Sequence, residues 1–168
     1  MVREDFSTII RKIRIFSGAI LFAYVIMHLL NHSINIFSID LADSVRSSYF
    51  HPIWQNPVGL VLLYGSFIAH MILGFSSILT RKSFKMKAKD WIQIIFPVLA
   101  LLFLLQHIAV SFIITKIFGG EETYSVFFAA MNTETPSDLI VGAILFSLMT
   151  IFIWVHGAIG IDSYLKME

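Results

Sequence analysis

Four long apolar segments without a formal charge constrain what this chain can fold into more than any other feature. They span residues 15–39, 58–80, 91–115 and 139–161, and each holds 23 to 25 residues. About 20 predominantly apolar residues are enough for one α-helical crossing of a bilayer, so each segment qualifies by length. None shows the polar stripe of a helix in a soluble bundle. The pattern predicts an all-α membrane protein with four transmembrane helices in a bundle.

Composition supports a lipid environment and excludes several function classes. The chain is 57% hydrophobic and only 14% charged, whereas soluble proteins carry about 25% charged residues. The 168 residues suit a single transmembrane anchor domain, and a net charge of +1 offers no basic excess for nucleic acid. The absence of cysteine excludes disulfides, thiolate-bound Fe–S clusters and covalently attached c-type haem within this chain.

The connections between the apolar segments differ in charge, and this difference predicts the orientation. Lys and Arg gather in the N-terminal stretch and in the 81–90 connection, whereas the two remaining connections are mostly acidic. The positive-inside rule therefore predicts that both termini and the 81–90 connection are cytoplasmic. The first apolar segment is too long for a cleavable signal peptide and is typical of a signal anchor.

Histidine is the polar residue that stands out inside the predicted spans. Each span carries one deep histidine, namely His28, His70, His107 and His156, and His32 follows His28 by one helical turn. A polar ring in the hydrocarbon region is costly, which makes such a residue a functional candidate. A single intramembrane histidine could simply bond a neighbouring helix, but one on each of four helices is harder to explain by packing.

The histidines sort into two depths when helical rise is counted from a charged residue at the cytoplasmic end of each span, namely Arg14, Arg81, Asp90 and Lys166. At 1.5 Å per residue, His70 and His156 lie ~17 and ~15 Å deep and form an inner pair. His28 and His107 lie ~21 and ~26 Å deep and form an outer pair. His32, at ~27 Å, matches His107 by depth as well as His28 does, so it can replace His28 as the outer ligand.

Paired histidines on different helices suit haem b with both axial positions of the iron filled. Such an iron has no open position for oxygen, so the expected chemistry is electron transfer. A structural zinc ion would require four ligands at one point, which two separated pairs do not provide. The sequence therefore predicts two haems b, with the iron ligands His28 and His107 for one and His70 and His156 for the other.

Two further features fit this prediction. A glycine follows each inner histidine by one turn, Gly74 after His70 and Gly160 after His156, within a shared H-x3-G-x2-S-x-L pattern. A missing side chain would let a porphyrin approach, although small residues also simply pack membrane helices together. Two cations near the cytoplasmic ends, Arg81 and Lys166, are candidates for pairing with the haem propionates.

The residues from His28 to His32 resemble the helix 1 motif of the di-haem cytochrome b anchors of succinate dehydrogenases and fumarate reductases. More closely, the chain resembles the haem-b membrane anchor of bacterial class III adenylate cyclases. The run that carries this resemblance covers nearly the whole chain: 14–18, 28–33, 54–57, 63–65, His70, His107 and 154–157. In the dehydrogenase anchors the first histidine of the motif is the ligand, which implies His28. Those anchors have five helices with ligands on the first, second, fourth and fifth, whereas here the first four helices each carry one.

The resemblance implies a quinone-responsive redox sensor that signals to a cytoplasmic cyclase domain, in the bacterial inner membrane. The alternative is the cytochrome b anchor subunit of a quinone oxidoreductase of the succinate dehydrogenase or fumarate reductase type. Expected partners are membrane lipid, quinone or quinol, and either a cyclase or flavin and Fe–S subunits; a homodimer is a further expectation. The chain alone is expected to be non-catalytic and is either the N-terminal part of a longer protein, a stand-alone anchor or a separate subunit.

Overall fold

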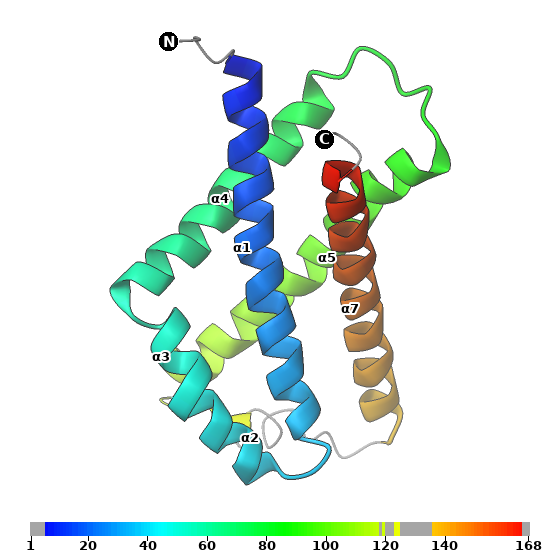
Figure 1. Cartoon of the computed structure of the whole chain (residues 1–168). Helices are drawn as coiled ribbons and strands as arrows, with labels where there is room; N and C mark the ends of the chain where they lie inside the picture. Colours follow the sequence, from blue (N-terminus) through cyan, green and yellow to red (C-terminus); the bar gives the residue numbers. More distant parts are fainter. Residues whose placement is uncertain (1–5, 118, 120–122, 125–135, 166–168) are drawn as a thin grey trace. The chain divides into compact units, whose positions relative to one another are not determined.

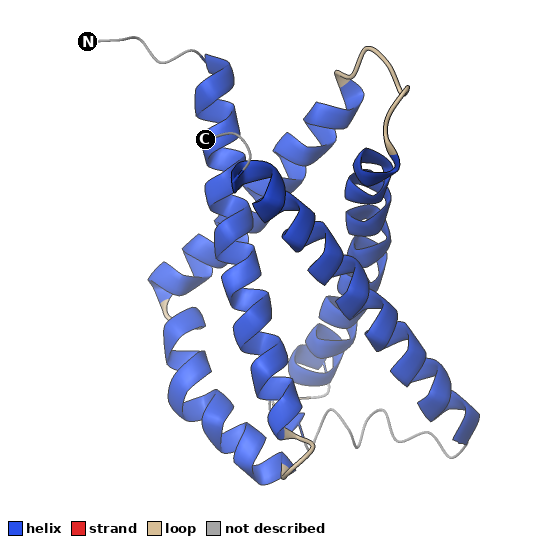
Figure 2. Cartoon of the chain, turned by 45° about the vertical axis from the view of Figure 1, so that its right-hand side comes forward, coloured by secondary structure: helices blue, strands red, loops and turns tan. Residues whose placement is uncertain are grey.

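The computed structural model describes residues 6–117, 119, 123–124 and 136–165, and every regular element among them is helical (Figure 2). Four helices are long and apolar enough to cross a membrane: α1 (Phe6–Ile34), α4 (Pro57–Leu79), α5 (Ala88–Phe112) and α7 (Pro136–Leu165). The shorter elements are α2 (Ile39–Val45), η1 (Arg46–Phe50), α3 (His51–Trp54) and η2 (Ile113–Ile117). The predicted all-α fold with four membrane-spanning helices is confirmed, and the chain is a multi-pass membrane protein.

The first helix differs from the predicted segment 15–39 at both ends. It begins at Phe6, nine residues before the charge-free stretch. The reason is that the arginines and the lysine before the apolar run are good helix formers. It ends at Ile34, and the chain turns before Ser38. The extended backbone of Ser38 (φ −164°, ψ 133°) and its hydroxyl, which accepts from the Leu41 N–H, start α2. A search for charge-free segments misses this turn because the polar residues beside it, Asn35 and Ser38, carry no formal charge.

Exposure along the helices is the reverse of that in a soluble protein. Large apolar side chains point outward: Val61 is 72% exposed and Phe16 is 67% exposed. The buried residues of the described part are mostly small or polar: Ser17, Asn31, Ala42, Gly59, Ser66, Ala100 and Tyr124. Helices in lipid associate through small and polar residues, because hydrocarbon solvates large apolar side chains as well as a protein core does.

The structure divides into two compact units, residues 1–85 and 86–168. In the first unit α1 packs along α4, and the stretch α2–η1–α3 returns from the end of α1 to the start of α4 (Figure 1). Asn56 forms the corner between α3 and α4. Its Oδ1 accepts from the N–H groups of Val58 and Gly59, and its Nδ2 donates to the carbonyls of Pro52 and Ile53. Asn56 therefore fixes the angle at which α4 leaves the connection.

The second unit is built on the antiparallel packing of α5 against α7 (Figure 1). At one end, the Nζ atom of Lys89 lies 2.5 Å from a carboxylate oxygen of Asp162. Further along, the ring of Phe152 lies 4.9 Å from that of Phe96 and 6.4 Å from that of Phe103. These contacts fix one register, in which residue numbers rise along α5 as they fall along α7.

Candidate functional site

His70 has the most specific surroundings of the histidines in the first unit. Its Nδ1 lies 3.1 Å from the carbonyl oxygen of Arg14 and 3.3 Å from the hydroxyl of Ser17, both on α1. The Ser17 hydroxyl in turn donates to the same carbonyl. A carbonyl can only accept, so Nδ1 carries the proton in this contact. The Nε2 of the neutral ring is then the unprotonated nitrogen, which is the form that binds a metal.

Gly18 provides the space for the His70 ring. A Cβ placed on Gly18 would lie 2.9 Å from the Cε1 and 3.3 Å from the Nδ1 of His70. Separations below 3.0 Å require something to move, and the ring is already held by its bond to Arg14. Sequence reasoning gave Gly18 no role of its own, because the residue lies in an uninterrupted apolar run and its neighbour on α4 is 52 positions away.

A Gly18→Ala substitution tests whether this space matters for ligand geometry. The added methyl group should push the His70 ring off the Arg14 carbonyl, and the loss of an orienting contact weakens metal ligation about 10–100-fold. If His70 binds a haem iron, the variant should lose that haem more readily during purification, as measured by haem absorbance per protein.

Gly65→Ala on α4 is the matched control, because nothing lies within 4 Å of a Cβ at that position. Equal haem retention by the Gly18 and Gly65 variants would show that the space between Gly18 and the His70 ring accommodates the extra methyl group.

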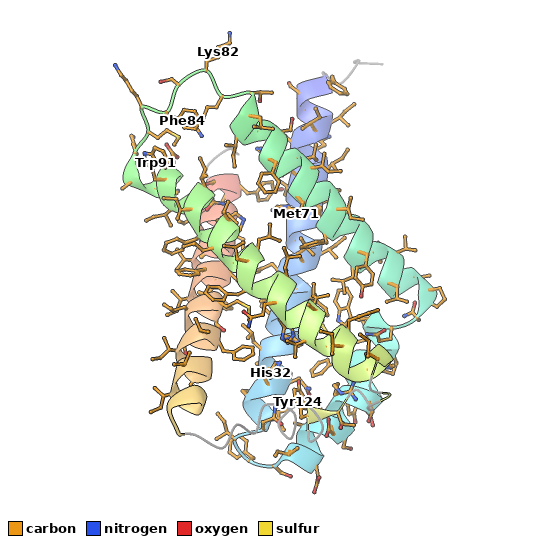
Figure 3. All side chains as sticks on the ribbon, turned by 180° about the vertical axis from the view of Figure 1, so that it is seen from behind. His32, Met71, Lys82, Phe84, Trp91 and Tyr124 are labelled. Carbon is orange, nitrogen blue, oxygen red and sulfur yellow. The ribbon has the colours of Figure 1, made fainter. Side chains whose placement is uncertain are left out.

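A second group of aromatic and histidine side chains lies near the other end of α1. The Nε2 atoms of His28 and His32 are 3.0 Å apart, and the two rings are nearly perpendicular. The ring of Tyr24 stacks on that of His28, with 5.6 Å between the ring centroids. The rings of Tyr24 and of Trp54 from α3 are nearly perpendicular, with their centroids 5.3 Å apart. Figure 3 labels His32 near the end of α1 that leads to α2. The rings of His28 and His32 are hydrogen-bonded to each other, so the two candidates for the outer ligand lie side by side.

His28 and His70 of the first unit lie at different levels of the α1–α4 pair. His70 of α4 packs beside Arg14 to Gly18 of α1. His28 is ten residues further along α1 than Gly18, which corresponds to ~15 Å of helix. A single small ligand cannot therefore contact both, and any metal or haem would use them at separate sites.

The second unit separates its histidines in the same way. His107 of α5 meets the ring of Phe146 at 6.1 Å. His156 is ten residues further along α7 than Phe146, again ~15 Å of helix. The Nδ1 atoms of His107 and His156 are both buried. His28 and His70 in the first unit, and His107 and His156 in the second, thus lie at two levels within their own unit.

The other predicted site residues have different outcomes. Gly74 has nothing within 4 Å of the position of a Cβ, so the helix surface is open there. Gly160 instead faces α5, where the amide nitrogen of Gln93 lies 3.7 Å from such a Cβ, and this is ordinary helix packing. Arg81 is exposed just after α4. Lys166 lies outside the described residues.

Within the described part of the chain, no three His, Cys, Asp or Glu side chains come together as a metal-binding group. The candidate sites are therefore single histidines and the His28–His32 pair. Comparisons with models of protein families, with curated proteins and with solved structures found no match to this chain.

Proposed function

We propose that this chain is a di-haem b membrane anchor that exchanges electrons with membrane quinol and signals to a cytoplasmic adenylate cyclase domain. The observation that supports it most is the orientation of His70. The Arg14 carbonyl accepts a hydrogen bond from the Nδ1–H group of His70, and Gly18 leaves room for the ring. A backbone carbonyl on the far nitrogen is the usual outer contact of a metal-binding histidine.

The proposal assigns four iron ligands in two pairs of like depth. His70 pairs with His156 on the inner haem, and His28 pairs with His107 on the outer haem, with His32 as the alternative to His28. Two observations favour separate sites over one cluster. The two proposed ligands of each unit lie about ten residues apart along the helices, and no larger ligand group occurs among the described residues.

The residues of the chain have distinct tasks in this proposal. The four histidines would hold the haem iron, and a bound haem would supply a one-electron carrier. Arg14 and Ser17 keep the His70 ring in one tautomer and one orientation. The open surface at Gly74 leaves space beside His70 for a flat group.

Electron exchange with quinol is a prediction of this proposal. Iron that is bound by two histidines would have no open position for oxygen, so the expected exchange partner is a lipid-soluble donor that approaches within the membrane. Adding a reduced quinone analogue to the anaerobic protein should reduce at least one haem rapidly, as read from its absorption spectrum. Haems that ignore quinols but respond to a soluble donor would contradict quinone sensing and leave a simple electron-transfer anchor.

The connection after α4 supports a partner on the side predicted to be cytoplasmic. Arg81, Lys82, Lys85 and Lys87 are all exposed there. Figure 3 shows Lys82 pointing away from the helices. These cations suit an acidic partner surface, and they also satisfy the positive-inside rule without any partner.

The anchor subunit of a succinate dehydrogenase or fumarate reductase is the second candidate function, and it uses the same histidines. The two differ in what the chain docks to. A cyclase coding region directly following the one for this chain supports the sensor. Neighbouring genes for flavin and Fe–S subunits, and their co-purification with this chain, support the dehydrogenase anchor.

A further inference from the structure

The strongest feature that the proposed function does not use is the pairing of His28 with His32. The two residues are one helical turn apart on α1, so their side chains lie on the same face. Their Nε2 atoms are 3.0 Å apart. Two ligands at ~2.1 Å from one metal ion, at a right angle to each other, are also about 3.0 Å apart, whereas tetrahedral ligands would be about 3.4 Å apart.

We infer that His28 and His32 form a two-nitrogen chelating site for a divalent transition metal ion of square-planar or octahedral preference. Cu²⁺ is the best candidate, because it favours such geometries with nitrogen ligands and has the highest affinity in its series. The remaining ligands would be water. Tyr24 and Trp54 lie on one side of the pair, since the ring of Tyr24 stacks on that of His28 and packs perpendicular to that of Trp54.

Asn35 provides a second, independent observation at this place. It lies in the turn directly after α1, where its backbone N–H donates to the carbonyl of His32 at 3.2 Å. Both of its side-chain amide atoms are buried and have no hydrogen-bond partner in the part of the chain that the structure describes. Buried amides are normally satisfied. A metal-bound water beside His32 would donate to the Asn35 amide oxygen and remove this deficit.

The inference does not depend on the proposed function, but it affects it. If the outer haem uses the Nε2 of His28, a metal ion on the same atom excludes the haem. The ion would then hold the outer site in a haem-free form. A metal ion bound here thus competes with the assembly of the outer redox centre.

The test is a copper titration of the full-length chain in detergent, taken from haem-starved cells and checked for helical content by circular dichroism. Electron paramagnetic resonance should show one tightly bound Cu²⁺ per chain with nitrogen coupling. His32→Gln and His28→Gln should each lower the affinity by at least about tenfold, because a direct ligand matters at least as much as the residue that orients it. His51→Gln, which changes an exposed histidine of α3, is the matched control and should bind as the unaltered chain does.

Equal copper affinity in the unaltered, His28 and His32 proteins would overturn the inference, as would helical protein that binds no copper. If the contact between His28 and His32 is only a hydrogen bond, the helical protein should bind no copper. Haem-loaded protein separates this inference from the proposed function. Copper uptake that falls as haem content rises supports the copper site and the role of His28 in haem binding. Undiminished uptake supports the copper site and shows that His28 is not a haem ligand.

Discussion

A His70→Ala variant is expected to bind one haem instead of two while the rest of the chain stays folded. The reason is that His70 is a proposed iron ligand whose ring is oriented by a hydrogen bond to the Arg14 carbonyl. The other histidines of the first unit lie at other positions along its helices and cannot replace His70. Pyridine haemochrome analysis should therefore give about half of the haem per protein of the unaltered chain, since one of two bis-histidine sites is lost.

The partner variants give this prediction its specificity. His156→Ala should remove the same haem as His70→Ala, with the same spectral component missing, and the double variant should lose no more. His107→Ala should remove the other component. His51→Ala should retain both haems, because His51 is an exposed residue of α3. Folded, unaltered protein that contains no haem when it is prepared from cells with an ample haem supply would contradict the proposed function as a whole.

A Gly59→Ala variant is expected to be the most destabilised single-methyl change in the first unit. A Cβ on Gly59 would lie 2.3 Å from the carbonyl oxygen of Ile53 and 2.9 Å from the Cα of Trp54. Both are backbone atoms, so no side chain can move aside to relieve the contact. Overpacking of this kind costs about 1–3 kcal/mol and sometimes more. Unfolding in mixed micelles, followed by circular dichroism, measures the loss.

Gly65→Ala on the same helix is the control and should change stability in the opposite direction. Nothing lies within 4 Å of a Cβ at Gly65, so alanine adds no clash. Alanine is also favoured over glycine in a helix interior by about 1 kcal/mol. If Gly59→Ala were as stable as Gly65→Ala, the corner between α3 and α4 would have to be looser than the contacts of Asn56 and Gly59 indicate.

Much of the fold follows from local sequence, and the reason is the bilayer. Each spanning segment must satisfy its backbone hydrogen bonds internally, so a long charge-free apolar run is bound to be a helix. Spans 58–80 and 91–115 therefore agree with α4 and α5 to within three residues at each end. The first span did not agree as well. Its end at Ile34 depends on the turn before Ser38, and the polar residues at that turn carry no formal charge that would mark the end of the span.

The candidate site was only partly accessible to sequence reasoning. A histidine in each span is visible from spacing and hydropathy, and helical rise alone predicts two levels. The contacts of those histidines are not visible, because they join residues far apart in the chain. The glycine–glutamine contact between α7 and α5 gives Gly160 a packing role, while the equivalent glycine Gly74 faces open space. The matching sequence pattern could not distinguish these two cases.

The sequence by itself determined that this protein spans a membrane four times and places one histidine in each crossing. It could do so because hydropathy, helical rise and charge act within single segments. Only the tertiary structure decided that Gly18 makes room for His70, that Arg14 orients its ring, and that His28 and His32 bond each other. Those facts depend on the register of one helix against another and on side-chain rotamers, which are set by packing in three dimensions rather than by any local pattern.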